Sequence, residues 1–497
     1  MQHICHSRRI EIVIMASELQ HKTFNGLVWT FLETFSLQLF GFVQGVILAR
    51  LLMPSDYGLI AMTGIFFAVS YTMIDSGFTN ALIRKKEHSA IDFSTVFVTN
   101  VVLSLVFALL LCACSSWIAD FYNQPLLRDI VRVNALCMFL QSFIAVQGTR
   151  MSINLQFKQK SVISVASTIS TGILSIIMAF MGYGVWSFVW PNFLGLLVKA
   201  CLFRYYQHWF PGISFSWDKF REFFSYGSKL LASGLLNTIF KNIYPIIIGK
   251  CYSASELGHY GKAHSYAALP STTVSNILAK VTFPVLAKVN DNTETLQGVY
   301  RRMIRVSAFV SFPIMVGMAV LARPFILLLI TEKWAPAIPL LQVLCFSLMW
   351  YPIHALNLQL LMVRGRSDLF LKLEIAKKIL ILAVILIVWR YGVFWMCVGS
   401  VFTSYVCLFI NTYYTGKLID VGFAKQMRDV APSLLNAFAM GLIVYIITLS
   451  ISNLWAQMAL GVAVGVLSYI GIARMMHSND FNYCITLIRD NILHKNN

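Results

Sequence analysis

The chain contains 497 residues, of which 58% are hydrophobic and 12% are charged, and its mean hydropathy is +0.70. Water-soluble proteins carry about 25% charged residues, so this composition excludes a set of soluble globular domains. The 39 lysine and arginine residues outnumber the 21 acidic residues and give a net charge of +18. Such an excess would be typical of a nucleic-acid-binding protein if the basic residues formed one surface.

The first 25 residues form a polar and basic lead whose apolar stretch, 10–16, is too short for a cleavable signal peptide. Met15 is an alternative initiator. Beyond this lead, fourteen segments have the roughly 20 mostly apolar residues that a membrane helix needs. They are 26–48, 57–79, 93–118, 129–147, 159–181, 183–203, 226–250, 257–287, 302–322, 336–363, 369–389, 391–415, 432–451 and 454–473. We therefore expect an all-α polytopic membrane protein with about 14 transmembrane helices.

Successive loops between these segments alternate between many and few basic residues. The segments on the side of the N-terminus hold 24 basic residues in eight groups of three, whereas the segments on the opposite side hold six. Lysine and arginine accumulate on the cytoplasmic side of membrane proteins. We therefore expect both termini to be cytoplasmic, and because the positive charge follows the topology, we expect no nucleic-acid partner.

Residues 47–58 and 247–258 share a pattern at a constant offset of 200 positions, with isoleucine, serine and glycine identical at 47, 55 and 58. Both copies join an outgoing helix to a returning helix, and six predicted spans separate them. An even number of spans implies two bundles with the same orientation, the parallel-repeat plan of some transporters. We predict six-helix bundles at 26–225 and 226–415, followed by two helices and a cytoplasmic tail at 416–497.

Eight segments in serial order carry a family resemblance. They are LARLLMPSDYG (48–58), DSGFTNALIRK (75–85), INLQFKQKSVISVAS (153–167), GYGVWSFVW (182–190), IIIGKCYSASELGHYGKAHSYAALP (246–270), FPVLAKV (283–289), ARPFILLLITEKWAPAIPLL (322–341) and LLMVRGRSDLFLKLEIAKK (360–378). The chain resembles the Wzx/WzxC-type lipid-linked oligosaccharide flippases of the MOP superfamily, which also contains the MATE exporters. It departs from the family at Tyr244-Pro245, where the family often has an acidic residue.

The resemblance implies a flippase of the bacterial inner membrane that moves polyprenyl-pyrophosphate-linked oligosaccharides for surface polysaccharide or lipopolysaccharide biosynthesis. It implies alternating access of two helix bundles and no cofactor. The expected partners are the lipid-linked oligosaccharide, membrane lipids, a polysaccharide polymerase and glycosyltransferases. The alternatives are a MATE-like cation or drug antiporter and a membrane glycosyltransferase or polymerase. The excess of intramembrane lysines over acids argues against the antiporter, and the short outer loops and the lack of a catalytic motif argue against an enzyme.

Intramembrane basic residues are the candidate substrate-binding groups, because each costs roughly 2.5–3.5 kcal/mol on insertion scales. Lys199, near the inner end of its span, is expected to extend to the headgroups instead. In the eighth span, steps of three and four residues place Lys262, Tyr266, Asn276 and Lys280 on one helix face. Lipid would reject this polar stripe, so it is expected to face a wet cavity or a partner helix.

In the seventh span, Lys241 and Asn237 lie on one face and complete the predicted cationic site for a pyrophosphate or an acidic sugar. The acidic candidates are Glu33 in the first span and Asp75 near the inner end of the second. Either could carry a coupling proton or pair with a lysine, and the sequence does not decide between these roles. No cysteine and histidine spacing indicates a metal site.

Overall fold

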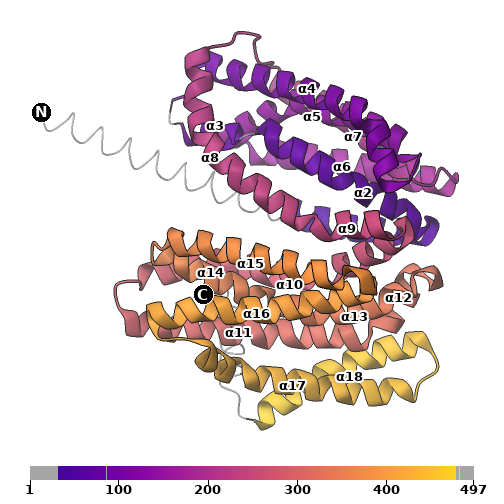
Figure 1. Cartoon of the computed structure of the whole chain (residues 1–497), viewed down its shortest axis with the longest axis vertical. Coiled ribbons are helices and arrows are strands. Elements are labelled where there is room, and N and C mark those ends of the chain that lie inside the picture. Colours follow the sequence, from indigo (N-terminus) through magenta and orange to yellow (C-terminus); the bar gives the residue numbers. More distant parts are fainter. Residues whose placement is uncertain (1–28, 30–31, 76, 86, 477–480, 482–497) are drawn as a thin grey trace, which may run out of the picture. The chain divides into compact units, whose positions relative to one another are not determined.

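The computed structural model describes residue 29 and residues 32–75, 77–85, 87–476 and 481, and these contain helices but no strand (Figure 1). The predicted all-α membrane fold is therefore confirmed. The chain divides into two compact units, the first ending at Leu257 and the second beginning at Gly258. The sequence repeat predicted a boundary after residue 225 instead, and the division into bundles at that residue stays a prediction.

The first unit begins with the helix Leu32–Leu51. The helices that follow it are α2 (Pro54–Asp75), α3 (Phe78–Arg84), α4 (Ala90–Tyr122), α5 (Leu127–Ile153), α6 (Phe157–Phe180), α7 (Trp186–Gln207), α8 (Trp217–Lys241) and α9 (Ile243–Cys251). Within this unit α4 packs on α5, α6 packs on α7, and α8 packs against α2, α3 and α4. The long helix α10 (Ala254–Lys288) starts in the first unit and continues into the second.

The second unit contains the remaining elements, two of which are short 3-10 helices. They are α11 (Thr293–Val320), α12 (Ala322–Ile330), η1 (Glu332–Trp334), α13 (Ala337–Leu348), α14 (Tyr351–Val363), α15 (Ser367–Val388), η2 (Trp389–Tyr391), α16 (Val393–Ile419), α17 (Phe423–Leu449) and α18 (Leu454–Met475). The closest helix pairs here are α11 with α17, α17 with α18, and α13 with α16.

Eleven helices of the described part are long and apolar enough to cross a membrane, or twelve if the bent pair α8–α9 counts as one span. Large apolar side chains project from them into the surroundings, for example Leu109, which is 62% exposed, and Leu467, which is 71% exposed. Water would penalise such faces and hydrocarbon would not. Helices α10 and α15 are not among the eleven, α15 because four charged residues lie in its first half. The count of fourteen spans stays a prediction.

Three of the predicted spans are interrupted, and one of them, 336–363, is divided between α13 and α14. The predicted span 57–79 ends as α2 at Asp75, and α3 begins at Phe78 after Gly77, whose φ of 74° favours glycine. A methyl group at position 77 would lie 2.9 Å from the Cα atom of Gly227 on α8. The predicted span 226–250 bends by 42° between Lys241 and Ile243. The apolar runs therefore located these helices correctly, but they did not reveal the breaks.

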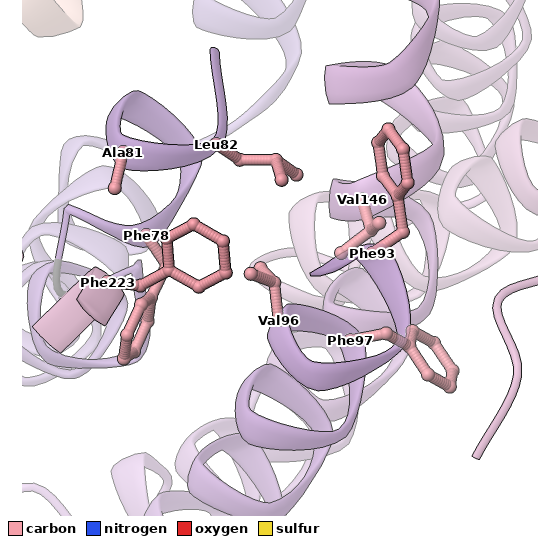
Figure 2. Close-up of a cluster of buried hydrophobic side chains, with 8 residues drawn as sticks. All are labelled: Phe78, Ala81, Leu82, Phe93, Val96, Phe97, Val146 and Phe223. Atoms are coloured by element: carbon pink, nitrogen blue, oxygen red, sulfur yellow. The ribbon is translucent and has the colours of Figure 1, made fainter. Parts of the chain in front are cut away.

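A cluster of buried apolar side chains holds α3, α4, α5 and α8 together at one end of the first unit (Figure 2). Its members are Phe78, Ala81, Leu82, Phe93, Val96, Phe97, Val146 and Phe223. Figure 2 shows the rings of Phe78 and Phe223 next to each other, on helices that are far apart in the sequence. Burying each such ring contributes about 1.5–3 kcal/mol relative to leaving it in water, so this cluster fixes the short helix α3 against α8.

The two copies of the sequence repeat have the same local structure. A helix ends at Leu51 and at Cys251, and the next helix begins three residues later in both copies. At the start of each second helix an acidic side chain accepts a backbone N–H bond, from Met53 to Asp56 and from Ser253 to Glu256. The repeat is thus equivalent at these two joints, while the pseudo-repeat of whole bundles stays a prediction.

In the second unit, α11, α14, α16 and α17 are joined by buried polar bonds. The side-chain amide of Gln426 donates to Asn357, Thr415 and the carbonyl oxygen of Val421 at 3.1, 2.9 and 3.1 Å. Arg301 on α11 forms two 2.7 Å bonds with the carboxylate of Asp429 on α17. These contacts fix the penultimate helix to the rest of its unit.

Candidate functional site

Of the predicted substrate-binding residues, two lie in the first unit. Lys241 is the last residue of α8, where the chain bends into α9, and its side chain is exposed. Asn237 lies one turn earlier and is also exposed. Among the described residues, Lys241 forms no ion pair with Glu33 or Asp75, so the structural alternative of a charge pair is not realised for this lysine. The substrate-binding role of both residues stays a prediction.

The other four residues lie on the part of α10 that belongs to the second unit. The Nζ atom of Lys262 lies 5.8 Å from the ring centroid of Tyr266 and 6.0 Å from that of Trp334. Tyr266 is buried and packs edge-on against Phe325, with ring centroids 5.3 Å apart. Lys262 therefore sits beside two aromatic faces that attract its charge.

The lower part of the predicted stripe has a different environment. Asn276 and Lys280 are exposed, whereas Tyr266 is packed inside the second unit. The four positions share a helix face by spacing, but neighbouring helices cover only the part near Tyr266. A single helix face is therefore partly packed and partly open, and the role of the stripe in substrate binding stays a prediction.

The two acidic candidates also differ from each other. The Oγ atom of Ser161 on α6 donates a 2.8 Å hydrogen bond to the carboxylate of Glu33 on the helix Leu32–Leu51. Electrostatically, Glu33 also acts on Lys199 of α7. Asp75 is exposed at the end of α2 and forms no ion pair within the described ranges. Glu33 thus links three helices of the first unit, and the coupling role of either residue stays a prediction.

A polar pocket of about 260 Å³ lies in the first unit between α3, α5, α6 and α7. Two lysines, Lys160 and Lys199, line it, together with the amide side chain of Gln141. Four hydroxyl groups complete its polar wall, those of Thr79, Thr149, Ser152 and Ser164. No acidic side chain is among the described residues that line this pocket, so its wall is cationic.

Sequence reasoning missed this pocket, because it expected Lys199 to extend to the headgroups and assigned no binding role to Lys160. A signal was nevertheless present in α6. Steps of three and four residues from Ser161 lead to further hydroxyl residues on one helix face, namely Ser164, Thr168, Thr171 and Ser175. This hydroxyl stripe resembles the polar stripe predicted on α10, although it contains no charge. It marks the face of α6 that meets other protein groups.

Close helix contacts hold the wall of the pocket. A methyl group at Gly195 of α7 would lie 1.8 Å from the Oγ1 atom of Thr171 on α6, so only glycine allows this approach. In the same region, Ser167 donates a 2.9 Å hydrogen bond to the carbonyl oxygen of Gly195. The lysine-bearing helices α6 and α7 are therefore packed closely against each other.

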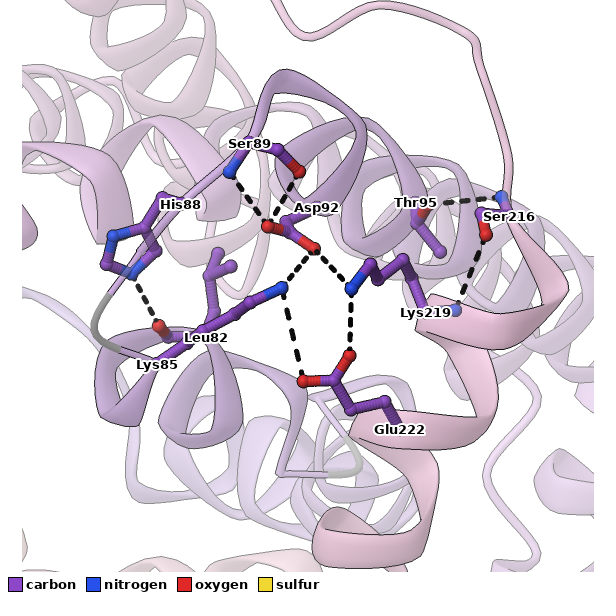
Figure 3. Close-up of polar contacts among 9 residues, drawn as sticks. All are labelled: Leu82, Lys85, His88, Ser89, Asp92, Thr95, Ser216, Lys219 and Glu222. Carbon is purple, nitrogen blue, oxygen red and sulfur yellow. Dashed lines mark hydrogen bonds and ion pairs between the residues drawn. The ribbon is translucent and has the colours of Figure 1, made fainter.

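A second charged cluster joins α4 and α8 in the first unit (Figure 3). Asp92 is fully buried, accepts hydrogen bonds from the N–H and Oγ of Ser89, and lies 2.7 Å from the Nζ atom of Lys85. Lys219 on α8 lies 4.0 Å from Asp92 and 3.1 Å from Glu222. The hydrogen bond to Glu222 raises the pKa of Lys219 above its usual value. Here each charge has an opposite neighbour, so the cluster connects helices.

Among the described residues, no group of three or more histidine, cysteine, aspartate or glutamate side chains could hold a metal ion.

Comparison with solved structures identifies the class of protein. The lipid II flippase MurJ in an inward closed conformation superimposes with a TM-score of 0.73 at 14% identity, covering 91% of this chain and 99% of that chain. An inward-facing multidrug resistance MATE transporter of the MOP superfamily gives a TM-score of 0.61 at 14% identity, covering 78% and 96%. The chain therefore has the fold of the MOP superfamily transporters.

Sequence comparison then identifies the family. Residues 47–339 match a family model described as polysaccharide biosynthesis protein, and the chain belongs to this family. Lipopolysaccharide biosynthesis protein WzxC of Escherichia coli strain K12 is 27% identical over 379 residues, covering 74% of this chain and 75% of that protein. Teichuronic acid biosynthesis protein TuaB of Bacillus subtilis strain 168 is 26% identical over 466 residues, covering 90% and 94%. The predicted resemblance is confirmed.

Proposed function

We propose that this protein moves lipid-linked oligosaccharides across the bacterial inner membrane for the assembly of a surface polysaccharide or lipopolysaccharide. The observation that carries this proposal is a polysaccharide-biosynthesis sequence on a fold shared with a lipid II flippase. The substrate class is an oligosaccharide on a polyprenyl pyrophosphate, in keeping with the names of the relatives. Both termini are proposed to be cytoplasmic, as the distribution of lysine and arginine favours.

The physical task of such a transporter is to shelter a charged and polar headgroup from hydrocarbon. Lysines, amides and hydroxyls replace the water around the pyrophosphate and the sugar, while the polyprenyl tail stays in the lipid. Alternating access of the predicted bundles 26–225 and 226–415 then exposes the headgroup on the outer side. Transport makes and breaks no covalent bond, so we propose that the protein is not an enzyme. A polymerase and glycosyltransferases are its proposed partners.

The test of this proposal replaces Lys241 and Lys262 with alanine and measures surface polysaccharide in a strain that lacks the natural gene. We expect the wild-type chain to restore the polysaccharide, and the double variant to lose most export at unchanged protein level. Lys288→Ala serves as the control, because Lys288 is exposed at the end of the same helix α10. Normal export by the double variant would remove both lysines from the site, and failure of the wild-type chain would contradict the function.

A MATE-like cation or drug antiporter is the second candidate, because the MATE fold also superimposes on this chain. A cavity for organic cations needs uncompensated carboxylates, whereas the described pocket of the first unit is lined by two lysines and no acid. We expect a strain that lacks the protein to have unchanged sensitivity to cationic dyes. Increased sensitivity, restored by the wild-type chain, would favour the antiporter.

A further inference from the structure

The pocket between α3, α5, α6 and α7 contains polar groups that lack partners. Among the described residues, the ammonium group of Lys199 and the side-chain amide of Gln141 form no hydrogen bond or ion pair. Lys160 donates a 2.7 Å bond to Ser152, a neutral hydroxyl that leaves its charge uncompensated. Polar groups in the membrane region are costly unless they find partners, so these donors are arranged for a group that enters the pocket.

The charge of the pocket selects the sign of that group. Two ammonium groups and several neutral donors face the space, and Lys160 and Lys199 are close enough to repel each other. The nearest acid is Glu33, which acts on Lys199 but is also bonded to Ser161 and is not part of the pocket wall. An anion with several acceptor oxygens would relieve the repulsion and accept hydrogen bonds from both lysines.

The size and the rim of the pocket limit what can enter. Its volume of about 260 Å³ is below the roughly 300–1,000 Å³ typical of sites for drug-sized ligands, so an oligosaccharide does not fit. Ile83, which also lines the pocket, is 49% exposed, whereas Phe203 is buried. The exposed apolar side chain of Ile83 and the two ammonium groups of the same pocket suit a headgroup whose lipid chain remains outside.

We propose that this pocket binds the phosphate groups of an anionic lipid, and that the lipid is the polyprenyl diphosphate carrier. The assignment of the carrier rests on the proposed function. Lys160 and Lys199 bind the phosphate oxygens from two helices, while Gln141 and Ser164 donate to the remaining acceptors. Thr149 and Ser152 already donate to carbonyl oxygens of their own helix. The sugar chain is bound elsewhere. The pocket lies near the N-terminal end of α6 and the C-terminal ends of α5 and α7, which basic-residue counting assigns to the cytoplasmic side.

The test uses the full-length chain in detergent and farnesyl pyrophosphate, a short prenyl diphosphate. Binding is followed as a concentration-dependent rise of the thermal unfolding midpoint, since a ligand that binds the native state stabilises it. We expect each of Lys160→Ala and Lys199→Ala to weaken binding by about tenfold, because a hydrogen bond to a charged group contributes about 1.5 kcal/mol or more. Unchanged affinity of the double variant would overturn the proposal.

Lys158→Ala is the matched control. Lys158 lies two residues before Lys160 on the same helix, is exposed, and places its Nζ atom 5.5 Å from the ring of Trp29, outside the pocket. We expect this variant to bind farnesyl pyrophosphate like the wild type. An equal loss of affinity in Lys158→Ala would show that general surface charge is responsible and would overturn the pocket assignment. If an alanine variant does not fold, Lys199→Gln and Lys160→Gln remove the charge and keep a polar side chain at each position.

A second arm identifies the source of the phosphate. The wild-type chain is placed in nanodiscs of phosphatidylcholine with or without phosphatidylglycerol, and binding of farnesyl pyrophosphate is measured in both. We expect similar affinities, which supports the diphosphate carrier. If phosphatidylglycerol removes binding in the wild type, the pocket takes an ordinary phospholipid headgroup, and the carrier assignment fails.

The outcomes also separate this inference from the proposed function. If the Lys160/Lys199 double variant has lost binding of farnesyl pyrophosphate but exports polysaccharide normally, the carrier subsite is contradicted and the proposed flippase function is not. If the wild-type chain binds farnesyl pyrophosphate but does not restore polysaccharide, the proposed flippase function is contradicted. The pocket then remains a binding site for anions.

Discussion

Buried polar side chains in the second unit bond one another, whereas those around the pocket of the first unit face open space. Gln426 has three partners for one amide nitrogen in a fully buried position. Gln141 and Lys199, by contrast, line a pocket without any partner in the described part of the chain. Polar groups of similar chemistry thus have two different roles. A closed network stabilises the helix packing, and an open set remains available to a ligand.

The largest expected effect tests the closed network. Replacing Gln426 with leucine leaves the buried groups of Asn357, Thr415 and Val421 short of hydrogen bonds, and each unsatisfied buried group costs about 1–3 kcal/mol. We expect Gln426→Leu to lower the free energy of unfolding by about 3 kcal/mol. The measurement is the unfolding midpoint of the purified chain in detergent.

The neighbouring position provides the control for this variant. Lys425 forms an exposed pair with Asp420, at 2.6 Å, and exposed pairs contribute about 0–1 kcal/mol. Lys425→Ala is therefore expected to leave the midpoint almost unchanged. Equal losses in the two variants would mean that the buried network has no special role in stability.

A smaller effect of opposite sign is expected in the open set. Because Lys199 has no hydrogen-bonding partner among the described residues, replacing it with methionine removes a partly buried charge and breaks no hydrogen bond. We expect Lys199→Met to be neutral or to stabilise the ligand-free chain by about 1 kcal/mol. The same unfolding experiment, without ligand, measures it. A loss of stability as large as that of Gln426→Leu would show that Lys199 is a structural residue.

The smallest effect concerns the charged cluster of α4 and α8. The pKa of Lys219 is raised in the folded state, chiefly by its hydrogen bond to Glu222. A raised pKa means that this contribution to stability is complete below the pKa of lysine in the unfolded chain and disappears as the pH rises through the folded pKa. As the pH rises above about 10.4, the ordinary pKa of lysine, the unfolding midpoint of the wild type is therefore expected to approach that of Lys219→Met. A constant difference would contradict this role.

The helices were predictable because apolar runs of about 20 residues are a strong, local signal. Interruptions such as Gly77 and the bend after Lys241 depend on which helices lie nearby, and a single run contains no such information. The candidate site shows the same limit. Spacing placed Tyr266 and Lys280 on one face, but packing against Phe325 covers one and leaves the other exposed. The lysines of the pocket were missed because 38 residues separate them in the sequence and α6 and α7 bring them together.

The joint at Gly58 limits which residues the chain tolerates at this position. A methyl group there would lie 1.7 Å from the carbonyl oxygen of Ala254, so the first turn of α10 rests directly on the backbone of α2. Any side chain at position 58 would force the starts of these two helices apart, and their approach therefore depends on glycine.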